Sequence, residues 1–165
     1  MTVRRAALSD HAAAVALWIA LHREHEAQDA RYRLADDAAE RWATDFGDWA
    51  RSDGDRVWLA ETPAAEGGAP VGLLTAHLTT PPPTFAPVLM VWVDDLYVAP
   101  HARGRGVAGL LLDEARIWAH GHEAGEIRAG VLSANPAGRA FWARQGAADF
   151  SVVITIPLSA DDTDG

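Results

Sequence analysis

The stretch from Asp94 to Gly109, DDLYVAPHARGRGVAG, joins a run of β-forming residues to the start of a helical pattern. Its last six residues fit G-x-G-x-x-G, the spacing of a dinucleotide-binding loop. The first turn of a helix has free N–H groups and the positive end of the helix dipole, so it attracts anions. Glycines let a phosphate approach the backbone, and Arg103 and Arg105 add positive charge. The stretch therefore predicts a strand, a diphosphate-binding loop and a helix, rather than a plain turn.

The position of this loop argues against two familiar diphosphate sites. A Rossmann loop opens its fold and is followed about 20 residues later by an acidic residue that binds the ribose. Here the loop lies two-thirds of the way along the chain, and the strand after the helix ends in VLSANP (131–136), without a carboxylate. A P-loop needs a lysine, and the chain has none. A dehydrogenase that binds NAD is therefore disfavoured.

Hydrophobic patterning predicts an α/β fold with antiparallel meanders and one central β-α-β unit. We expect one domain over residues 1–158 and a disordered tail over 159–165. Strands are expected at 2–8, 55–61, 71–78, 88–98, 126–132 and 150–158. Helices are expected from Ser9 or Asp10, and over 34–52, 104–120 and 136–145.

Composition narrows the class of protein. Apolar residues make up 49% of the chain, no apolar run could span a bilayer, and there is no cysteine for a disulfide or a thiolate metal site. A cytoplasmic protein without a membrane partner is expected. The net charge of −9 disfavours nucleic acid and favours cationic partners, including small amines.

Two linked motifs resemble one family. R-x-x-G-x-A, at Arg103, Gly106 and Ala108, follows a strand that ends L-Y-V-x-P, and SANPAGRAFWARQGAADF (133–150) follows one strand later. Together they resemble the GNAT superfamily of acyl-CoA-dependent N-acyltransferases, whose signature is (R/Q)-x-x-G-x-(G/A). The resemblance extends over about residues 88–157. The resemblance implies a mixed, mostly antiparallel central sheet flanked by helices, with a strand–glycine loop–helix cofactor site.

The same resemblance implies acetyl-CoA as the co-substrate and no metal. Backbone groups of Leu96, Tyr97 and Val98 would bind the pantetheine arm, on a strand that bulges and splays from the strand after it. The pyrophosphate would lie on Arg103, Gly104, Arg105, Gly106, Val107, Ala108 and Gly109. Cofactor contacts from the second motif would come from Asn135, Phe141 and Trp142.

Acetyl transfer to an amine needs a base for the ammonium, a donor for the developing oxyanion and a proton for the leaving thiolate. By analogy with the polyamine-acetylating branch, Asp94 would be the base and Asp95 would bind the substrate cation, with Tyr97 as a substitute acid. Strand alternation puts the two aspartates on opposite faces unless a bulge intervenes. Solvated carboxylates, or carboxylates paired to arginines, are the alternative.

Trp142 departs from the family, which usually carries a tyrosine acid at this position. An indole N–H donates a hydrogen bond but gives up no proton at useful pH. Since a thiolate leaves readily, we expect Trp142→Tyr to change the rate less than tenfold. A poor catalyst is the alternative explanation.

The acceptor site of the family usually draws on the first two helices and their linker, here HREHEAQDARYRL (22–34). It offers Glu24, His25, Asp29 and Tyr32 as a wall for a cation, or simply a solvated helix end. Its histidines lack the spacing of a zinc site.

The sequence thus predicts an N-acetyltransferase that transfers acetyl from acetyl-CoA to a primary amine by direct attack, with a small cationic amine or polyamine as acceptor. A protein N-terminus, a lysine side chain or an amine antibiotic is the alternative acceptor. An acyl-CoA sensor without turnover is the alternative function. The resemblance also implies a homodimer.

Overall fold

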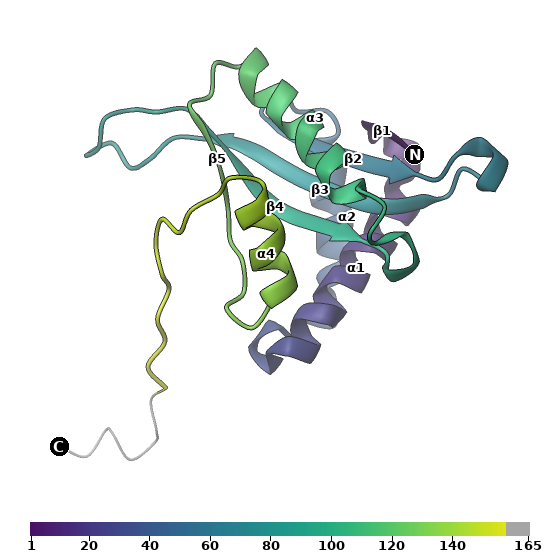
Figure 1. The fold of residues 1–165 in the computed structure, drawn as a ribbon, viewed down its shortest axis with the longest axis horizontal. Coiled ribbons are helices and arrows are strands. Elements are labelled where there is room, and N and C mark those ends of the chain that lie inside the picture. The colour runs from purple at the N-terminus through teal and green to yellow at the C-terminus, as the bar shows by residue number, and fades with distance from the viewer. Residues whose placement is uncertain (158–165) are drawn as a thin grey trace. The chain divides into compact units, whose positions relative to one another are not determined.

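A computed structural model describes residues 1–157 (Figure 1). The tail predicted to be disordered, 159–165, lies outside these residues. The chain divides into two compact units, the first over Met1–Gly130 and the second starting at Val131, and each is described by itself. The expectation of a single domain over 1–158 therefore stays a prediction.

The first unit is built on a five-stranded sheet in the order β1-β2-β3-β4-β5. Neighbouring strands from β1 to β4 are antiparallel, and β5 runs parallel to β4. The mixed, mostly antiparallel sheet expected from the sequence is confirmed. The strands are β1 Thr2–Arg5, β2 Asp55–Glu61, β3 Pro70–Thr79, β4 Met90–Val98 and β5 Glu126–Ala129.

Three long helices of this unit cover the two faces of the sheet: α1 His11–Gln28, α2 Ala38–Trp49 and α3 Val107–Gly121. Side chains of a strand alternate between the two faces of a sheet, so β2 contributes side chains to both. Val57 and Leu59 join one buried cluster with α1 and α2. Trp58, between them, packs its ring against Trp118 of α3, so α3 lies on the opposite face (Figure 1).

A β-bulge interrupts the pairing of β3 with β4. Thr75 lies opposite Asp95, whereas the next residue, Ala76, lies opposite Val93. Asp94 is therefore the extra residue of β4. A bulge of this kind bends the strand and turns neighbouring side chains toward the same side.

Beyond the bulge, β4 separates from β5. The ladder between them runs only from Met90 opposite Glu126 to Val93 opposite Ala129. From Asp95 to Val98, β4 pairs with β3 on one edge, and no strand of residues 1–157 pairs with its other edge. The bulge and the splay are both features that the resemblance implied.

Over its described residues, 131–157, the second unit has one helix, α4 Pro136–Arg144. The strand expected at 150–158 is wrong over its described part, because residues 150–157 form no strand. Their pattern of Val and Ile favours extended backbone, but a strand exists only where a partner edge supplies its hydrogen bonds. The side chains of Phe150, Val152, Val153, Ile154 and Ile156 are exposed instead.

Candidate functional site

The glycine loop, residues 103–109, joins β4 to α3 in a conformation that requires glycine at two positions. Gly104 and Gly106 have φ angles of 74° and 78°, in the left-handed region that other residues avoid. Gly106 is the N-cap of α3, so the N–H groups of Val107, Ala108 and Gly109 belong to the unpaired first turn.

Space beside the loop is open. A Cβ built on Gly104, Gly106 or Gly109 meets no atom within 4 Å. An anionic group can therefore approach the backbone N–H groups and the positive end of the α3 dipole. The loop has the shape and the donors that a diphosphate requires.

Both arginines of the loop are held by carboxylates. Arg103 donates from Nε to the carbonyl oxygen of Val98 at 2.8 Å and from Nη2 to Oε1 of Glu24 at 2.6 Å. Arg105 makes a longer contact with Glu66, at 3.3 Å. A diphosphate on the loop would compete with Glu24 and Glu66 for these guanidinium groups.

Tyr97 connects the end of β4 to the same network. Its side chain is buried, its hydroxyl donates to Oε1 of Glu24 at 3.4 Å, and the Arg103 guanidinium lies 5.7 Å from its ring centre. Burial, and then the nearby Glu24 carboxylate, raise the pKa of Tyr97. The phenol therefore keeps its proton at neutral pH. Leu96 and Val98 flank it on the part of β4 that has left β5.

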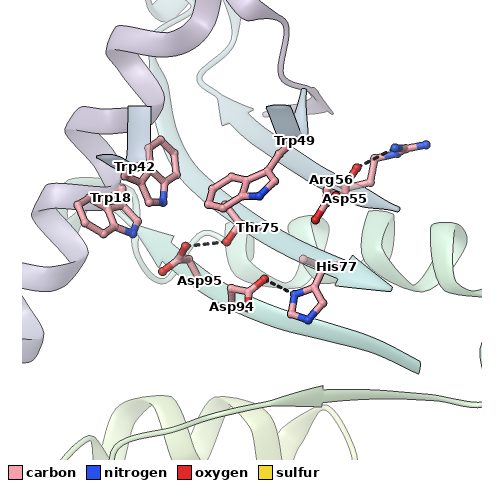
Figure 2. A pocket seen from close by; sticks show the side chains of 10 residues that line it. Trp18, Trp42, Trp49, Asp55, Arg56, Thr75, His77, Asp94 and Asp95 are labelled. Carbon is pink, nitrogen blue, oxygen red and sulfur yellow. Dashed lines mark hydrogen bonds and ion pairs between the residues drawn. The ribbon is translucent and has the colours of Figure 1, made fainter. Parts of the chain in front are cut away.

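A second feature, which we call the tryptophan pocket, is a cavity of about 230 Å³ on the face of the sheet covered by α1 and α2 (Figure 2). Its lining comes from α1, α2, β2, β3 and β4, and combines indole rings with carboxylates. The lining residues are Trp18, Trp42, Trp49, Asp55, Arg56, Thr75, Ala76, His77, Asp94 and Asp95.

The bulge brings both aspartates of β4 to this pocket, although strict alternation would have separated them. Asp95 is buried; it accepts a hydrogen bond from Thr75 Oγ1 at 2.6 Å and lies 3.6 Å from His22 Nε2. Asp94 keeps 43% of its side chain exposed, with Oδ2 at 2.8 Å from His77 Nδ1. Asp95 is thus fixed by its neighbours, whereas Asp94 faces the open part of the pocket.

The electrostatics of Asp94 suit a base. Burial raises the pKa of Asp94, and the hydrogen bond from His77 acts in the opposite direction. A carboxylate with a raised pKa accepts a proton more readily than an ordinary aspartate.

None of the four residues predicted to bind the acceptor lines the tryptophan pocket. Glu24 is paired with Arg103, and Asp29 caps the turn after α1 by accepting from the backbone and side chain of Arg31, which lowers the pKa of Asp29 to about 2. The ring of His25 touches that of Tyr32, and burial lowers the pKa of His25. Their role in acceptor binding stays a prediction.

The remaining predicted cofactor residues lie in the second unit. Asn135 caps α4 by accepting from the backbone N–H of Gly138 at 2.8 Å. The rings of Phe141 and Trp142 meet edge to face, with centres 5.4 Å apart. Their contact with a cofactor also stays a prediction.

Sequence reasoning missed the lining residues outside β4. A signal was present: Thr75 and His77 are polar residues inside an apolar run, on the same face as Leu73. Polar side chains on the covered face of a strand often mark a site. The three tryptophans carried no such signal, because large aromatic residues on helices are usual in cores.

Comparisons with known proteins agree with this geometry. Residues 16–147 match the family model described as the acetyltransferase (GNAT) family. No curated protein sequence matches the chain.

Solved structures share the fold at low sequence identity. A mutant of the BH1408 protein from Bacillus halodurans is 19% identical with a TM-score of 0.83, and the match covers 96% of this chain and all of the other. The aminoglycoside acetyltransferase AAC(6')-Iy, bound to a CoA bisubstrate analogue, is 18% identical with a TM-score of 0.74, over 96% and 98% of the two chains. A ribosomal-protein-alanine N-acetyltransferase from Brucella melitensis is 19% identical with a TM-score of 0.67, over 96% and 100%. Such identities show the fold alone.

Among residues 1–157, no helix is long and apolar enough to cross a membrane, and no group of three or more His, Asp or Glu side chains could hold a metal ion. The family match covers most of the chain, and the sheet, the bulge and the glycine loop have the arrangement that the motifs implied. The chain belongs to the GNAT family of acetyltransferases.

Proposed function

We propose that this protein transfers an acetyl group from acetyl-CoA to a primary amine, and that the acceptor is a small cationic amine or polyamine. The observation that carries the proposal is the bulge of β4, which turns Asp94 and Asp95 into one pocket beside the stretch of β4 that has left β5. A base and a cation-binding carboxylate then lie next to an open strand edge.

Each part of the site has a separate task. The glycine loop binds the diphosphate of acetyl-CoA through its backbone N–H groups. Arg103 also binds the diphosphate, which displaces Glu24 from the guanidinium group. The free edge of β4 from Leu96 to Val98 binds the pantetheine amides as an added strand would. This places the thioester near the middle of β4.

Asp95 holds the incoming ammonium by charge, since Thr75 fixes its carboxylate. Asp94 accepts a proton from that ammonium, and the freed lone pair attacks the thioester carbonyl carbon. The new C–N bond forms as the C–S bond breaks, the nitrogen loses its second proton to solvent, and CoA leaves as a thiolate. Tyr97 keeps its proton at neutral pH and is the candidate donor to that sulfur.

The test is CoA thiol release from acetyl-CoA across a panel of amines, with a no-acceptor control. The chain has no cysteine, so a thiol reagent detects only liberated CoA. The panel holds diamines, polyamines, an aminoglycoside and peptides with a free N-terminus or lysine. Acceptor-dependent release that is lost in Asp94→Asn is expected. Tight acetyl-CoA binding without release by any acceptor would overturn the proposal in favour of a sensor.

A further inference from the structure

The tryptophan pocket contains a third carboxylate, to which the proposed reaction gives no role. Asp55 begins β2 and lines the pocket with Asp94 and Asp95 (Figure 2). On the sheet, Asp55 lies opposite His77 of β3, and His77 bonds to Asp94 of β4. Asp55 is thus two strands away from β4 and level with Trp92, two residues before Asp94, so the Cα atoms of Asp55 and Asp94 are about 10 to 12 Å apart at the usual strand spacing and rise.

The charges of the pocket do not balance. Its lining carries three aspartates and one arginine, and the Arg56 guanidinium is turned away: its Nη1 donates to the carbonyl oxygens of Ser52 and Asp55, and its Cζ lies 5.2 Å from the Trp118 ring centre on the other face. Repulsion from Asp55 is among the causes that raise the pKa of Asp94. A ligand with two positive charges would relieve this repulsion more than a ligand with one.

An unpaired donor points to a ligand independently of the carboxylates. Trp42 is only 5% exposed, and its Nε1 has no hydrogen-bond partner among residues 1–157. Figure 2 shows this nitrogen on the edge of the ring turned toward Asp95 and Thr75. A buried N–H without a partner is costly, and an ammonium cannot satisfy it because both groups are donors. It requires a lone pair, such as that of a hydroxyl oxygen.

Indole rings form the apolar walls of the pocket. The ring of Trp42 stacks on that of Trp18 with centres 5.4 Å apart and meets that of Trp49 edge to face at 5.6 Å. Such a wall contacts the CH groups of a short spacer, and its ring faces attract cations.

We propose that the acceptor is a diamine whose spacer carries a hydroxyl group: Asp55 binds the second ammonium, and Trp42 Nε1 donates to the hydroxyl oxygen. This inference rests on the proposed function, because the first ammonium is the one that Asp94 and Asp95 receive. It makes Asp55 and Trp42 specificity-determining residues.

The test uses four classes of amine: a diamine and a monoamine, each with and without a hydroxyl group on its carbon chain. The four are compared at equal chain length, for chains of three, four and five carbons. Binding to the protein–CoA complex is measured by calorimetry, and turnover by thiol release. The variants are Asp55→Asn and Trp42→Phe. Asp53→Asn is the matched control, since it removes the same charge two residues away and outside the pocket.

We expect Asp55→Asn to weaken diamine binding and kcat/KM about tenfold and to change the monoamine values less than twofold. Asp53→Asn should change neither more than twofold. Wild-type protein should prefer the hydroxylated diamine about threefold to tenfold, and Trp42→Phe should remove that preference. The wild-type comparison needs no variant, so it stands even where Trp42→Phe fails to fold.

Two results overturn the inference: equal losses for diamine and monoamine in Asp55→Asn, or no hydroxyl preference in the wild-type protein. Neither depends on catalysis. If the diamine binds through Asp55 but no amine releases CoA, the proposed function fails and the inference stands. If monoamines and diamines react equally well and Asp55→Asn has no effect, the proposed function stands and the inference fails.

Discussion

The glycine loop and the tryptophan pocket both adjoin strand β4, but the loop uses backbone groups of one segment and the pocket uses side chains of several. The loop is a contiguous segment that offers backbone N–H groups, and its shape depends on positive φ angles at Gly104 and Gly106. The pocket gathers side chains from five elements, and its chemistry depends on carboxylates and an indole N–H. A backbone site tolerates most changes of side chain except at its glycines, whereas a side-chain site fails when one functional group is lost.

The largest expected effect comes from the pocket. Asp94→Asn keeps the size of the side chain but cannot accept a proton, so we expect kcat/KM for the amine to fall at least about 100-fold. The KM for acetyl-CoA should stay within twofold, because the loop is unchanged. Steady-state kinetics with each substrate varied in turn measure both values.

Thermal melting of the same variant is its control. Burial raises the folded-state pKa of Asp94 above its unfolded value. The ionised side chain therefore lowers the free energy of unfolding at pH values above the folded-state pKa, and has no such effect at pH values below the unfolded-state pKa. Asn carries no charge, so at neutral pH the melting temperature of Asp94→Asn should be equal or higher. A lower melting temperature would indicate that the hydrogen bond with His77 outweighs the cost of burial.

The loop gives the next largest effect. Gly106→Val forces a β-branched residue to a φ of 78°, which strains the N-cap of α3 and moves the first-turn N–H groups. We expect the KM for acetyl-CoA to rise about tenfold while the KM for the amine stays within twofold. Gly121→Ala is the matched control, because Gly121 lies at the other end of α3, has no positive φ and has open space around its Cβ position. Equal effects of the two changes would contradict this account of the loop.

Glu24 tests whether the two regions are independent, since it was expected to bind the acceptor but pairs with Arg103 of the loop. Glu24→Gln weakens that ion pair and leaves Arg103 freer to bind a diphosphate. We expect the Kd for CoA, measured by calorimetry, to fall about threefold at low ionic strength, with the effect shrinking as salt is added. An increase in the KM for the amine, with no change for CoA, would instead assign Glu24 to the acceptor.

The smallest effect is a shift of a pH profile. The hydrogen bond from His77 lowers the pKa of Asp94, so its loss in His77→Phe should raise that pKa further. Since protonated Asp94 cannot act as base, activity is lost as the pH falls through the pKa of Asp94. The acid limb of kcat should therefore move to higher pH, while the KM for acetyl-CoA is unchanged. A limb that stays in place would exclude Asp94 as the titrating group.

The sequence by itself determined the features that are local. Strand β2 was predicted with the bounds it has, and β3 within a residue at each end, because alternating apolar residues and flanking glycines and prolines act over a few positions. The glycine loop could be predicted for the same reason, since a diphosphate cradle at a helix start is made by neighbouring residues.

Only the tertiary structure decided the features that depend on a partner. Asp94 and Asp95 share a pocket because β4 has a bulge where it pairs with β3, and no property of the two aspartates alone requires it. The tryptophan pocket unites Trp42 with Asp55 and His77 across intervals that no local pattern spans. Residues 150–157 have the composition of a strand yet form none, because strand formation depends on tertiary pairing, which composition does not specify.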